Sequence, residues 1–315
     1  MAGPFTWTFD APTGVYKSHA MSMKLYEAAV ENSICLDHVD TAEGYGKGKG
    51  ETVTLTRVRN ITEPGSADLD ELMRIPEDEF DLSTKLITVK EIGRAVPYTS
   101  LSNDLSEFDI ENPIQSKLKD QMRLVLDTKA ATAFKRTLIK YAPTGAATNN
   151  ITVNGTFGAA ATSNLNFFHV EEIRDYLYDT LHAPPLEGDK YVGLFRTLGL
   201  RGLKRDTKWE EWHKYTDPTS KFTGEVGQIE GVRFVESNHS NAFGKVGTSS
   251  VLGEGVIFGK EAVVIAEAMT PELRAAIPDD FGRSKAVAWY GILEFDIIWD
   301  TANAGEARIV HVGSA

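Results

Sequence analysis

The chain has 315 residues, of which 42% are hydrophobic, and 33 Lys and Arg stand against 45 Asp and Glu for a formal net charge of −12. The hydrophobic content is sufficient for a large core and excludes a globally disordered chain. The acidic balance argues against a protein whose whole surface grips nucleic acid, because that grip comes from Lys and Arg displacing counterions. It is compatible with a container that must not adhere to its nucleic-acid contents.

The first 43 residues are predicted to form an extended arm followed by a short helix. Residues 1–20 are rich in Gly, Pro, Thr and aromatic residues, and they lack the basic and apolar segments of a signal peptide. Such an arm needs another surface to order it. Residues 21–36 carry Leu and Ala at helical spacing and are predicted to form the helix.

A long antiparallel hairpin is predicted next. The glycine-rich run GYGKGKG at residues 44–50 leads into a strand at 51–61, and the partner strand is expected at 84–96. The tip between the strands, residues 62–82, is acidic and contains prolines. Both strands carry many charged and threonine positions, and an isolated two-stranded hairpin is marginally stable in water. We therefore expect another surface, such as that of a neighbouring subunit, to hold this hairpin.

The longest predicted helix covers residues 113–142, which contain no glycine and no proline after the first position. Apolar side chains recur on it every three or four positions, which indicates a buried face. Asn112 is the predicted N-cap, and Pro143 and Gly145 are expected to end the helix. The opposite face is basic and carries Lys117, Lys119, Arg123, Lys129, Lys135, Arg136 and Lys140.

The rest of the chain mixes helices with non-sequential strands, which favours an α+β fold over a doubly wound sheet. Strands are predicted at 151–153, 190–195, 228–237, from 256, 286–300 and 308–312, and helices at 169–181, 197–204, 209–215 and 260–269. Gly231 is interpreted as a bulge in its strand. The strand at 286–300 is the clearest, because its odd positions from Val287 to Trp299 are apolar or glycine. This face is expected to form core beneath the long helix.

No constellation of residues predicts catalysis, and no cofactor, metal site or membrane span is expected. The glycine-rich run departs from the phosphate-binding loop, because Lys49 follows Gly44 by five positions and a strand comes next in place of a helix. A nucleophile–base pair or a metal site at Cys35 and His38 is an alternative hypothesis, but a lone cysteine is usually a small core side chain. As the only cysteine, Cys35 also excludes an internal disulfide.

Several segments resemble the major capsid proteins of tailed bacteriophages. The hairpin strands GKGKGETVTLTRVRNIT and LITVKEIGRAVPYTSL resemble the extended-loop strands of the coat-protein group of N-four-type podophages. The segment GEVGQIEGVRFVES at residues 224–237 resembles the most recognisable stretch of that group. The order of arm, hairpin, long helix, inserted α/β region and final strand is similar to that of the Hong Kong 97-type fold. The resemblance covers residues 21–313.

The resemblance implies five successive parts of the chain. They are an N-terminal arm and short helix at 1–43, an extended loop at 44–100, the spine helix and first part of a peripheral domain at 101–165, an axial domain at 166–275, and the C-terminal strands of the peripheral domain at 276–315.

The resemblance also implies a structural coat protein without enzymatic activity. Copies would assemble as hexamers and pentamers in the host bacterial cytoplasm, and the icosahedral shell of the virion would enclose double-stranded DNA. Further implied partners are a portal protein and a separate scaffolding protein, because only about twenty residues precede the resemblance. A decoration protein is left open. The alternatives are an encapsulin-type shell around protein cargo, which shares the fold, and a cytoplasmic enzyme of unknown class that uses Cys35.

The acidic hairpin tip is predicted to dock onto the basic surface of an adjacent subunit, with the long helix as the leading candidate. The tip has eight acids and one base, and the helix has seven bases and two acids. Complementary charge of this kind sets orientation and encounter more than affinity. The alternative is that both faces are merely solvated. The candidate contact residues are Glu63, Asp68, Asp70, Glu71, Glu77, Asp78 and Glu79 on the tip and Lys117, Lys119, Arg123 and Lys129 on the helix.

Overall fold

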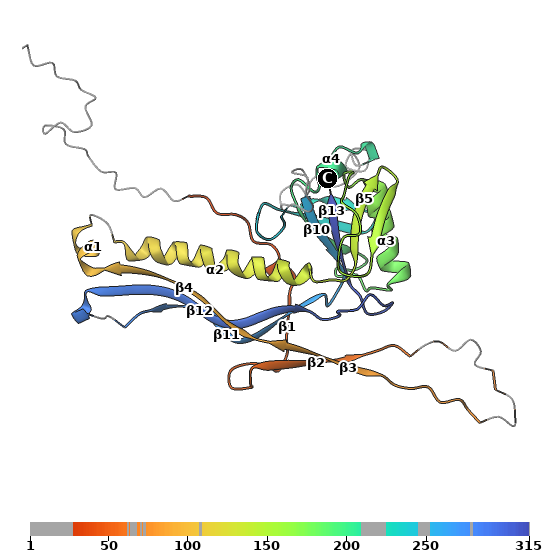
Figure 1. The fold of residues 1–315 in the computed structure, drawn as a ribbon, viewed down its shortest axis with the longest axis horizontal. Helices are drawn as coiled ribbons and strands as arrows, with labels where there is room; N and C mark the ends of the chain where they lie inside the picture. Colours follow the sequence, from red (N-terminus) through yellow and green to blue (C-terminus); the bar gives the residue numbers. More distant parts are fainter. Residues whose placement is uncertain are drawn as a thin grey trace, which may run out of the picture.

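The structure is a computed structural model, and it describes residues 28–61, 63, 68–69, 71, 74–106, 109–208, 225–244, 253–277 and 280–314. The molecule is elongated, with a long helix above a sheet, a hairpin below the sheet, and an α/β domain at one end (Figure 1). The predicted arm at 1–20, the first part of the helix at 21–36, the helix at 209–215 and Asp70 lie outside the described residues.

The long helix α2, Glu111–Phe134, lies along a four-stranded sheet in the order β1-β11-β12-β4. The strands are β1 (Asp40–Thr41), β4 (Lys90–Thr99), β11 (Val263–Ala275) and β12 (Ser284–Ile297). The predicted apolar face of β12 is confirmed, because Val287, Trp289, Leu293, Phe295 and Ile297 are all buried. Burying a large apolar side chain contributes about 1.5–3 kcal/mol, so this face holds the helix on the sheet.

The helix α2 begins and ends earlier than predicted. Asp109 accepts a hydrogen bond from the Glu111 backbone N–H at 3.1 Å, and Asn112 lies inside the helix, where its amide donates to Asp109 at 2.7 Å. The N-cap assignment to Asn112 is therefore wrong. After Phe134 the chain leaves the helix, because β5, Lys140–Gly145, pairs in parallel with the C-terminal strand. Strand pairing outweighs the continuing helical periodicity there.

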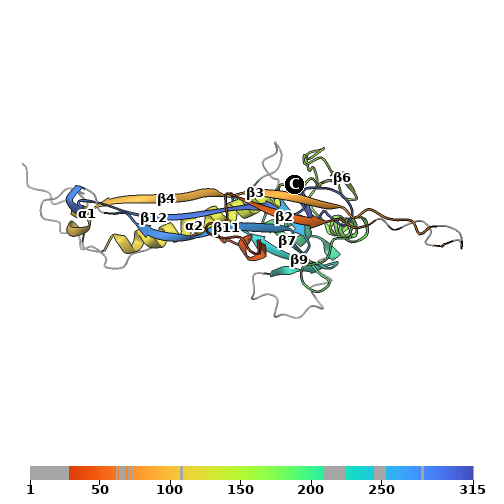
Figure 2. The same cartoon turned by 90° about the horizontal axis from the view of Figure 1, so that it is seen from below.

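The hairpin is shorter than predicted and is buried at its root. Its strands are β2, Thr52–Val58, and β3, Leu82–Thr88, and the second predicted strand divides because β4 then crosses to the four-stranded sheet. Val53 and Ile87 are 8% and 2% exposed and pack under β11. At the root, therefore, the surface that holds the hairpin belongs to its own chain. Figure 2 shows the hairpin projecting past the α/β domain.

The α/β domain is built on a seven-stranded sheet in the order β6-β5-β13-β10-β7-β9-β8. The further strands are β6 (Thr148–Thr152), β7 (Tyr191–Arg196), β8 (Glu225–Ile229), β9 (Val232–Ser237), β10 (Gly253–Phe258) and β13 (Ile309–Ser314). The helices of this domain are α3 (Phe167–Asp175), which continues as the π-helical turn η2 (Tyr176–Thr180), and α4 (Arg201–Lys204). The predicted strands at 151–153, 190–195, from 256 and at 308–312, and the helix at 169–181, are confirmed with small shifts of their ends.

Three predicted elements are wrong. The predicted helix at 260–269 is the strand β11, whose β-branched residues pair along β12. The predicted strand at 228–237 is a hairpin, because Glu230 and Gly231 both have positive φ values, of 46° and 72°, and turn the chain between β8 and β9. Residues 28–35 are not helical, and only η1, Leu36–His38, forms a short 3-10 turn.

Candidate assembly surfaces

Ion pairs fix the root of the hairpin to its own chain. The Arg57 guanidinium donates to Asp300 Oδ1 at 2.5 Å and to the Ile298 carbonyl at 3.1 Å. Lys85 Nζ lies 3.4 Å from Asp296 and 3.5 Å from Asp300. Burial alone would raise the pKa of Asp300, but the hydrogen bond from Arg57 and the charge of Lys85 outweigh it and lower this pKa. Arg57 and Lys85 thus hold the hairpin root against the C-terminal end of β12 and the residues just after it.

The hairpin tip is exposed and combines acids with large apolar side chains. The predicted contact residues that the structure describes here are all exposed: Glu63, Asp68, Glu71, Glu77, Asp78 and Glu79. Within this segment, Arg74 pairs with Glu77. Seven apolar side chains of the hairpin are more than half exposed: Val58, Ile61, Leu69, Ile75, Phe80, Leu82 and Leu86. A concentration of exposed apolar side chains on one element indicates an interaction site.

The cations in the C-terminal half of α2 and just beyond it are paired within their own chain. Lys129 Nζ lies 3.3 Å from Glu294, and Arg136 Nη1 lies 3.2 Å from Asp296. Lys135 Nζ lies 2.9 Å from Glu254 Oε1. The structure therefore ties Lys129, one of the predicted contact residues, to the sheet below the helix.

The cations in the N-terminal half of α2 lie nearer the surface. Lys119 and Arg123 are exposed, and Arg123 donates to the Ser33 carbonyl at 3.3 Å. Lys117 lies 3.4 Å from Asp120 on the next turn. The predicted tip and helix residues are not brought together within one chain, because the hairpin tip projects at the end of the molecule opposite α1, Ser100–Leu105 (Figure 1).

An apolar groove runs beside this half of the helix. It has a volume of about 360 Å³ and lies between α2 and β4. Its lining residues are Val96, Pro113, Ile114, Lys117, Leu118 and Gln121.

A second apolar patch lies at the end of the sheet far from the hairpin tip. Leu101, Leu105, Ile277 and Phe281 are 65%, 78%, 92% and 106% exposed. The Ser100 backbone N–H donates to the Arg283 carbonyl at 3.0 Å, which joins α1 to the turn η4, Asp280–Gly282. Phe281 has a φ of 54°, a conformation that costs a non-glycine residue about 1–2 kcal/mol. The Phe281 backbone is thus strained while its side chain is fully exposed, and a concentration of exposed apolar side chains of this kind indicates an interaction site.

The structure does not assemble a catalytic pair at Cys35 and His38. Cys35 is fully buried, and burial, followed by the charge of Asp127, raises the pKa of its thiol well above the usual value. The His38 ring packs edge-on against Phe258, with ring centroids 5.7 Å apart. A protonated, buried thiol is a poor nucleophile. Among the residues that the structure describes, no group of three or more His, Cys, Asp or Glu is placed to hold a metal, and no helix is long and apolar enough to cross a membrane.

Comparison with known proteins gives a match in structure alone. No family model and no curated protein matches the sequence. The capsid asymmetric unit of cyanophage Pam1 is similar with a TM-score of 0.71 and 14% identity, covering 97% of this chain and 98% of that chain. The head structure of Helicobacter pylori bacteriophage KHP40 gives a TM-score of 0.72 at 11% identity, covering 98% and 99%. The capsid of Ralstonia phage GP4 gives 0.68 at 13% identity, covering 98% of each chain.

The chain has the Hong Kong 97-type capsid fold. The fold class predicted from the sequence is thereby confirmed. In this capsid fold α2 stands where the spine helix is expected and the β2–β3 hairpin where the extended loop is expected. The division into five parts remains a prediction, and the sheets cross its boundaries. β11 falls in the predicted axial part but lies in the four-stranded sheet, and β5 and β13 fall in the predicted peripheral parts but lie in the seven-stranded sheet.

Proposed function

We propose that this chain is the major capsid protein of a tailed bacteriophage and that its copies form an icosahedral shell around double-stranded DNA. The observation that carries the proposal is the match to phage capsid subunits over nearly the full length of both chains. The net charge of −12 supports a shell that does not adhere to its DNA.

The surfaces of the single chain also favour a subunit of an assembly. The hairpin exposes apolar side chains along its length, and the far end of the sheet exposes Phe281 completely. Monomeric proteins rarely expose such patches. Two apolar surfaces at opposite ends of an elongated subunit support a repeating head-to-tail contact between copies.

In this proposal the subunits form hexamers and pentamers in the host bacterial cytoplasm, with a separate scaffolding protein and a portal protein as partners. A shell around protein cargo is the rival function, because it uses the same fold. The resemblance of residues 224–237 to phage coat proteins favours the DNA container. The buried thiol of Cys35 argues against an enzyme that uses this residue.

Electron microscopy and content analysis of assembled particles test the proposal. The full chain is expressed with and without the candidate scaffolding protein, and particles are isolated by sedimentation. Closed shells or ring-shaped capsomers are expected, and shells from infected cells should protect DNA from nuclease. A chain that stays monomeric under all these conditions, or native shells filled with one protein in place of DNA, would contradict the proposal.

We propose that the hairpin tip of one copy docks beside the N-terminal half of α2 in an adjacent copy. Lys119 and Arg123 are exposed there, and the groove between α2 and β4 accepts an apolar side chain. Ile75 and Phe80, which flank the acids Glu77, Asp78 and Glu79, are 67% and 61% exposed and have the matching chemistry. Charge would set the register, and the apolar side chains would supply affinity.

A further inference from the structure

Asp127 is a fully buried carboxylate near the C-terminal end of the long helix, with 0% of its surface exposed. Its Oδ1 accepts hydrogen bonds from the Cys35 backbone N–H at 2.8 Å and from the Ser33 hydroxyl at 3.1 Å. Its Oδ2 lies 2.8 Å from Nδ1 of His239. A buried carboxylate is tolerated only where such donors replace water. Asp127 therefore joins three segments at one point: α2, the chain before η1, and the loop that follows β9.

His239 extends this network toward the surface. Its side chain is 1% exposed, and its Nε2 lies 3.5 Å from Glu31 Oε2. The Glu31 carboxylate accepts hydrogen bonds from the backbone N–H of Ser240 at 3.3 Å and from its hydroxyl at 3.0 Å. The ring of His239 thus lies between two carboxylates, Asp127 on α2 and Glu31 before η1.

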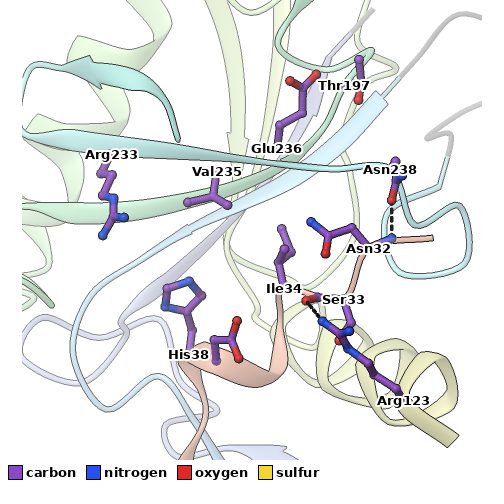
Figure 3. A pocket seen from close by; sticks show the side chains of 11 residues that line it. Asn32, Ser33, Ile34, His38, Arg123, Thr197, Arg233, Val235, Glu236 and Asn238 are labelled. Atoms are coloured by element: carbon purple, nitrogen blue, oxygen red, sulfur yellow. Dashed lines mark hydrogen bonds between the residues drawn. The ribbon is translucent and has the colours of Figure 1, made fainter. Parts of the chain in front are cut away.

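Residues 28–35, here called the strap, have no helix or strand of their own. Polar contacts hold the strap on both sides. The Asn32 backbone N–H donates to Asn238 Oδ1 at 2.5 Å, and Arg123 of α2 donates to the Ser33 carbonyl at 3.3 Å (Figure 3). These polar contacts hold the strap together with the burial of Ile34 and Cys35.

A cleft of about 720 Å³ lies beside the strap, between it, α2 and β9 (Figure 3). Its walls are mainly polar and include Asn32, Ser33, Arg123 and Asn238. A close-packed apolar joint resists rearrangement, whereas polar groups beside an open cleft can exchange partners with water. Ile34 and Cys35 are the only buried apolar side chains of the strap. Both belong to the core cluster that includes Phe134 and Phe258, so release of the strap withdraws two small apolar contributions and leaves the larger side chains of that core in place.

We propose that the Asp127–His239 pair is a latch that holds the strap in place and couples its position to the joint between α2 and the α/β domain. Opening the latch releases residues 31–35 and the loop at 238–240 together, because both segments are bound to the same carboxylate. The device belongs to the single chain, so its test is independent of the proposed capsid function.

Hydrogen exchange of the full-length unassembled chain, read by mass spectrometry, tests the latch. The variants are Asp127→Asn and His239→Gln, with Asp175→Asn as the matched control at an exposed carboxylate of α3. In both latch variants the amides of 31–35 and 238–240 should exchange about tenfold faster, whereas β12 and β13 keep their protection. The control should behave as the unchanged chain.

Two results would overturn the latch. Unchanged exchange at 31–35 would mean that Ile34 and Cys35 alone hold the strap. A uniform acceleration that includes β12 and β13 would mean that Asp127 and His239 are ordinary core groups whose loss unfolds the chain. If Asp127→Asn is insoluble, His239→Gln decides between these outcomes, because it removes the ring and leaves the carboxylate with its two donors from the strap.

Discussion

Lys129 of α2 lies 3.3 Å from Glu294 of β12, and the two side chains are 27% and 10% exposed. This pair binds the helix to the sheet on the side that the sequence pattern presents as a solvent-facing basic stripe. Lys119, on the same stripe, is exposed. The C-terminal half of the basic face therefore stabilises the subunit, whereas Lys119 in the N-terminal half stays exposed.

The two halves of the basic face should respond differently to the same substitution. Lys129→Met leaves the nearly buried Glu294 carboxylate with Lys90 at 3.8 Å and the Phe295 backbone N–H at 3.4 Å, and should lower the free energy of unfolding by about 1–3 kcal/mol. Lys119→Met, the matched control, should change it by less than about 0.5 kcal/mol. Urea denaturation of the unassembled chain measures both. Equal stability of the two variants would show that the Lys129–Glu294 pair contributes nothing.

The apolar face of β12 should dominate the stability of the subunit. Trp289 and Phe295 are each 1% exposed and lie between α2 and the sheet. Replacing either with Ala should cost about 3–5 kcal/mol, which is a large part of the stability of a typical domain. Trp289→Phe keeps most of the volume but leaves Gln121 without the indole N–H that donates to it at 3.2 Å, so its cost should be smaller. Thermal unfolding and soluble yield give the order, and an unchanged melting temperature in both Ala variants would contradict the buried face.

The features that the sequence predicts well are those that short periodic patterns encode. The alternation from Val287 to Ile297 defines a half-buried strand by itself, and the spacing in α2 defines its buried stripe. The sequence does not predict the strand β11, because VVIAEAM is compatible with a helix as well as with a strand. Only its pairing with β12 decides between the two. Asp127 lies on the buried face of α2, one turn before Ala130 and Ala131. An acid at such a position in the sequence indicates a buried carboxylate. Its partners Cys35 and His239 are 92 and 112 residues away, so no local pattern identifies them.

A buried charge network should make the joint between α2 and the α/β domain sensitive to acid. Burial tends to raise the pKa of Glu254, but hydrogen bonds from His311 and Lys135 outweigh it and lower this pKa to about 2. A carboxyl whose pKa is lowered on folding adds stability above its unfolded pKa of about 4.5, and this stability is lost as the pH falls toward 2. The unchanged chain should exceed Glu254→Gln in stability by about 3 kcal/mol at pH 7, with a gap that closes between pH 4.5 and 2.

The other members of this network have their own pH windows. Burial lowers the pKa of Lys140 to about 8, so below that pH the charged ammonium group destabilises the folded state. The free energy of unfolding should therefore rise as the pH increases from 8 toward 10.5. Burial also lowers the pKa of His311, so stability should fall as the pH drops through 6.5. Lys140→Met should remove the alkaline rise and leave the Glu254 window in place. Thermal melting across the pH range separates these contributions, and identical pH profiles for the variant and the unchanged chain would contradict the assignment.

The exposed Phe281 should matter for assembly and not for folding. Its side chain is fully exposed, so Phe281→Ser removes no buried surface and should leave the melting temperature of the unassembled chain unchanged. If the far end of the sheet is a contact surface, the same substitution should reduce the yield of closed shells. Tyr178→Ser, at a 60% exposed aromatic side chain of η2, is the control for loss of an exposed ring. Normal shell yield from Phe281→Ser would remove this patch from the assembly contacts.

The proposed docking of the hairpin tip is tested by reversing charge on both sides. Glu77, Asp78 and Glu79 changed together to Lys should block shell closure while the chain stays folded, because like charges then meet at the contact. Lys117, Lys119 and Arg123 changed to Glu in the same chain should restore closure in part. Single reversals should have little effect, since an exposed pair is worth only about 0–1 kcal/mol. Particle yield by sedimentation and microscopy measures closure.

The geometry of the subunit supplies the controls for this charge reversal. The first control changes three acids that lie away from the tip, on α3 and η2, to Lys, and it tests the effect of net charge alone. These acids are Glu171, Asp175 and Asp179. Lys129→Glu, directed at Glu294, should not rescue the tip variant, because this cation already has its partner within the chain. The docking proposal requires rescue by the N-terminal helix cations and not by Lys129. If both helix variants rescue equally, or neither does, the tip docks elsewhere or responds only to total charge.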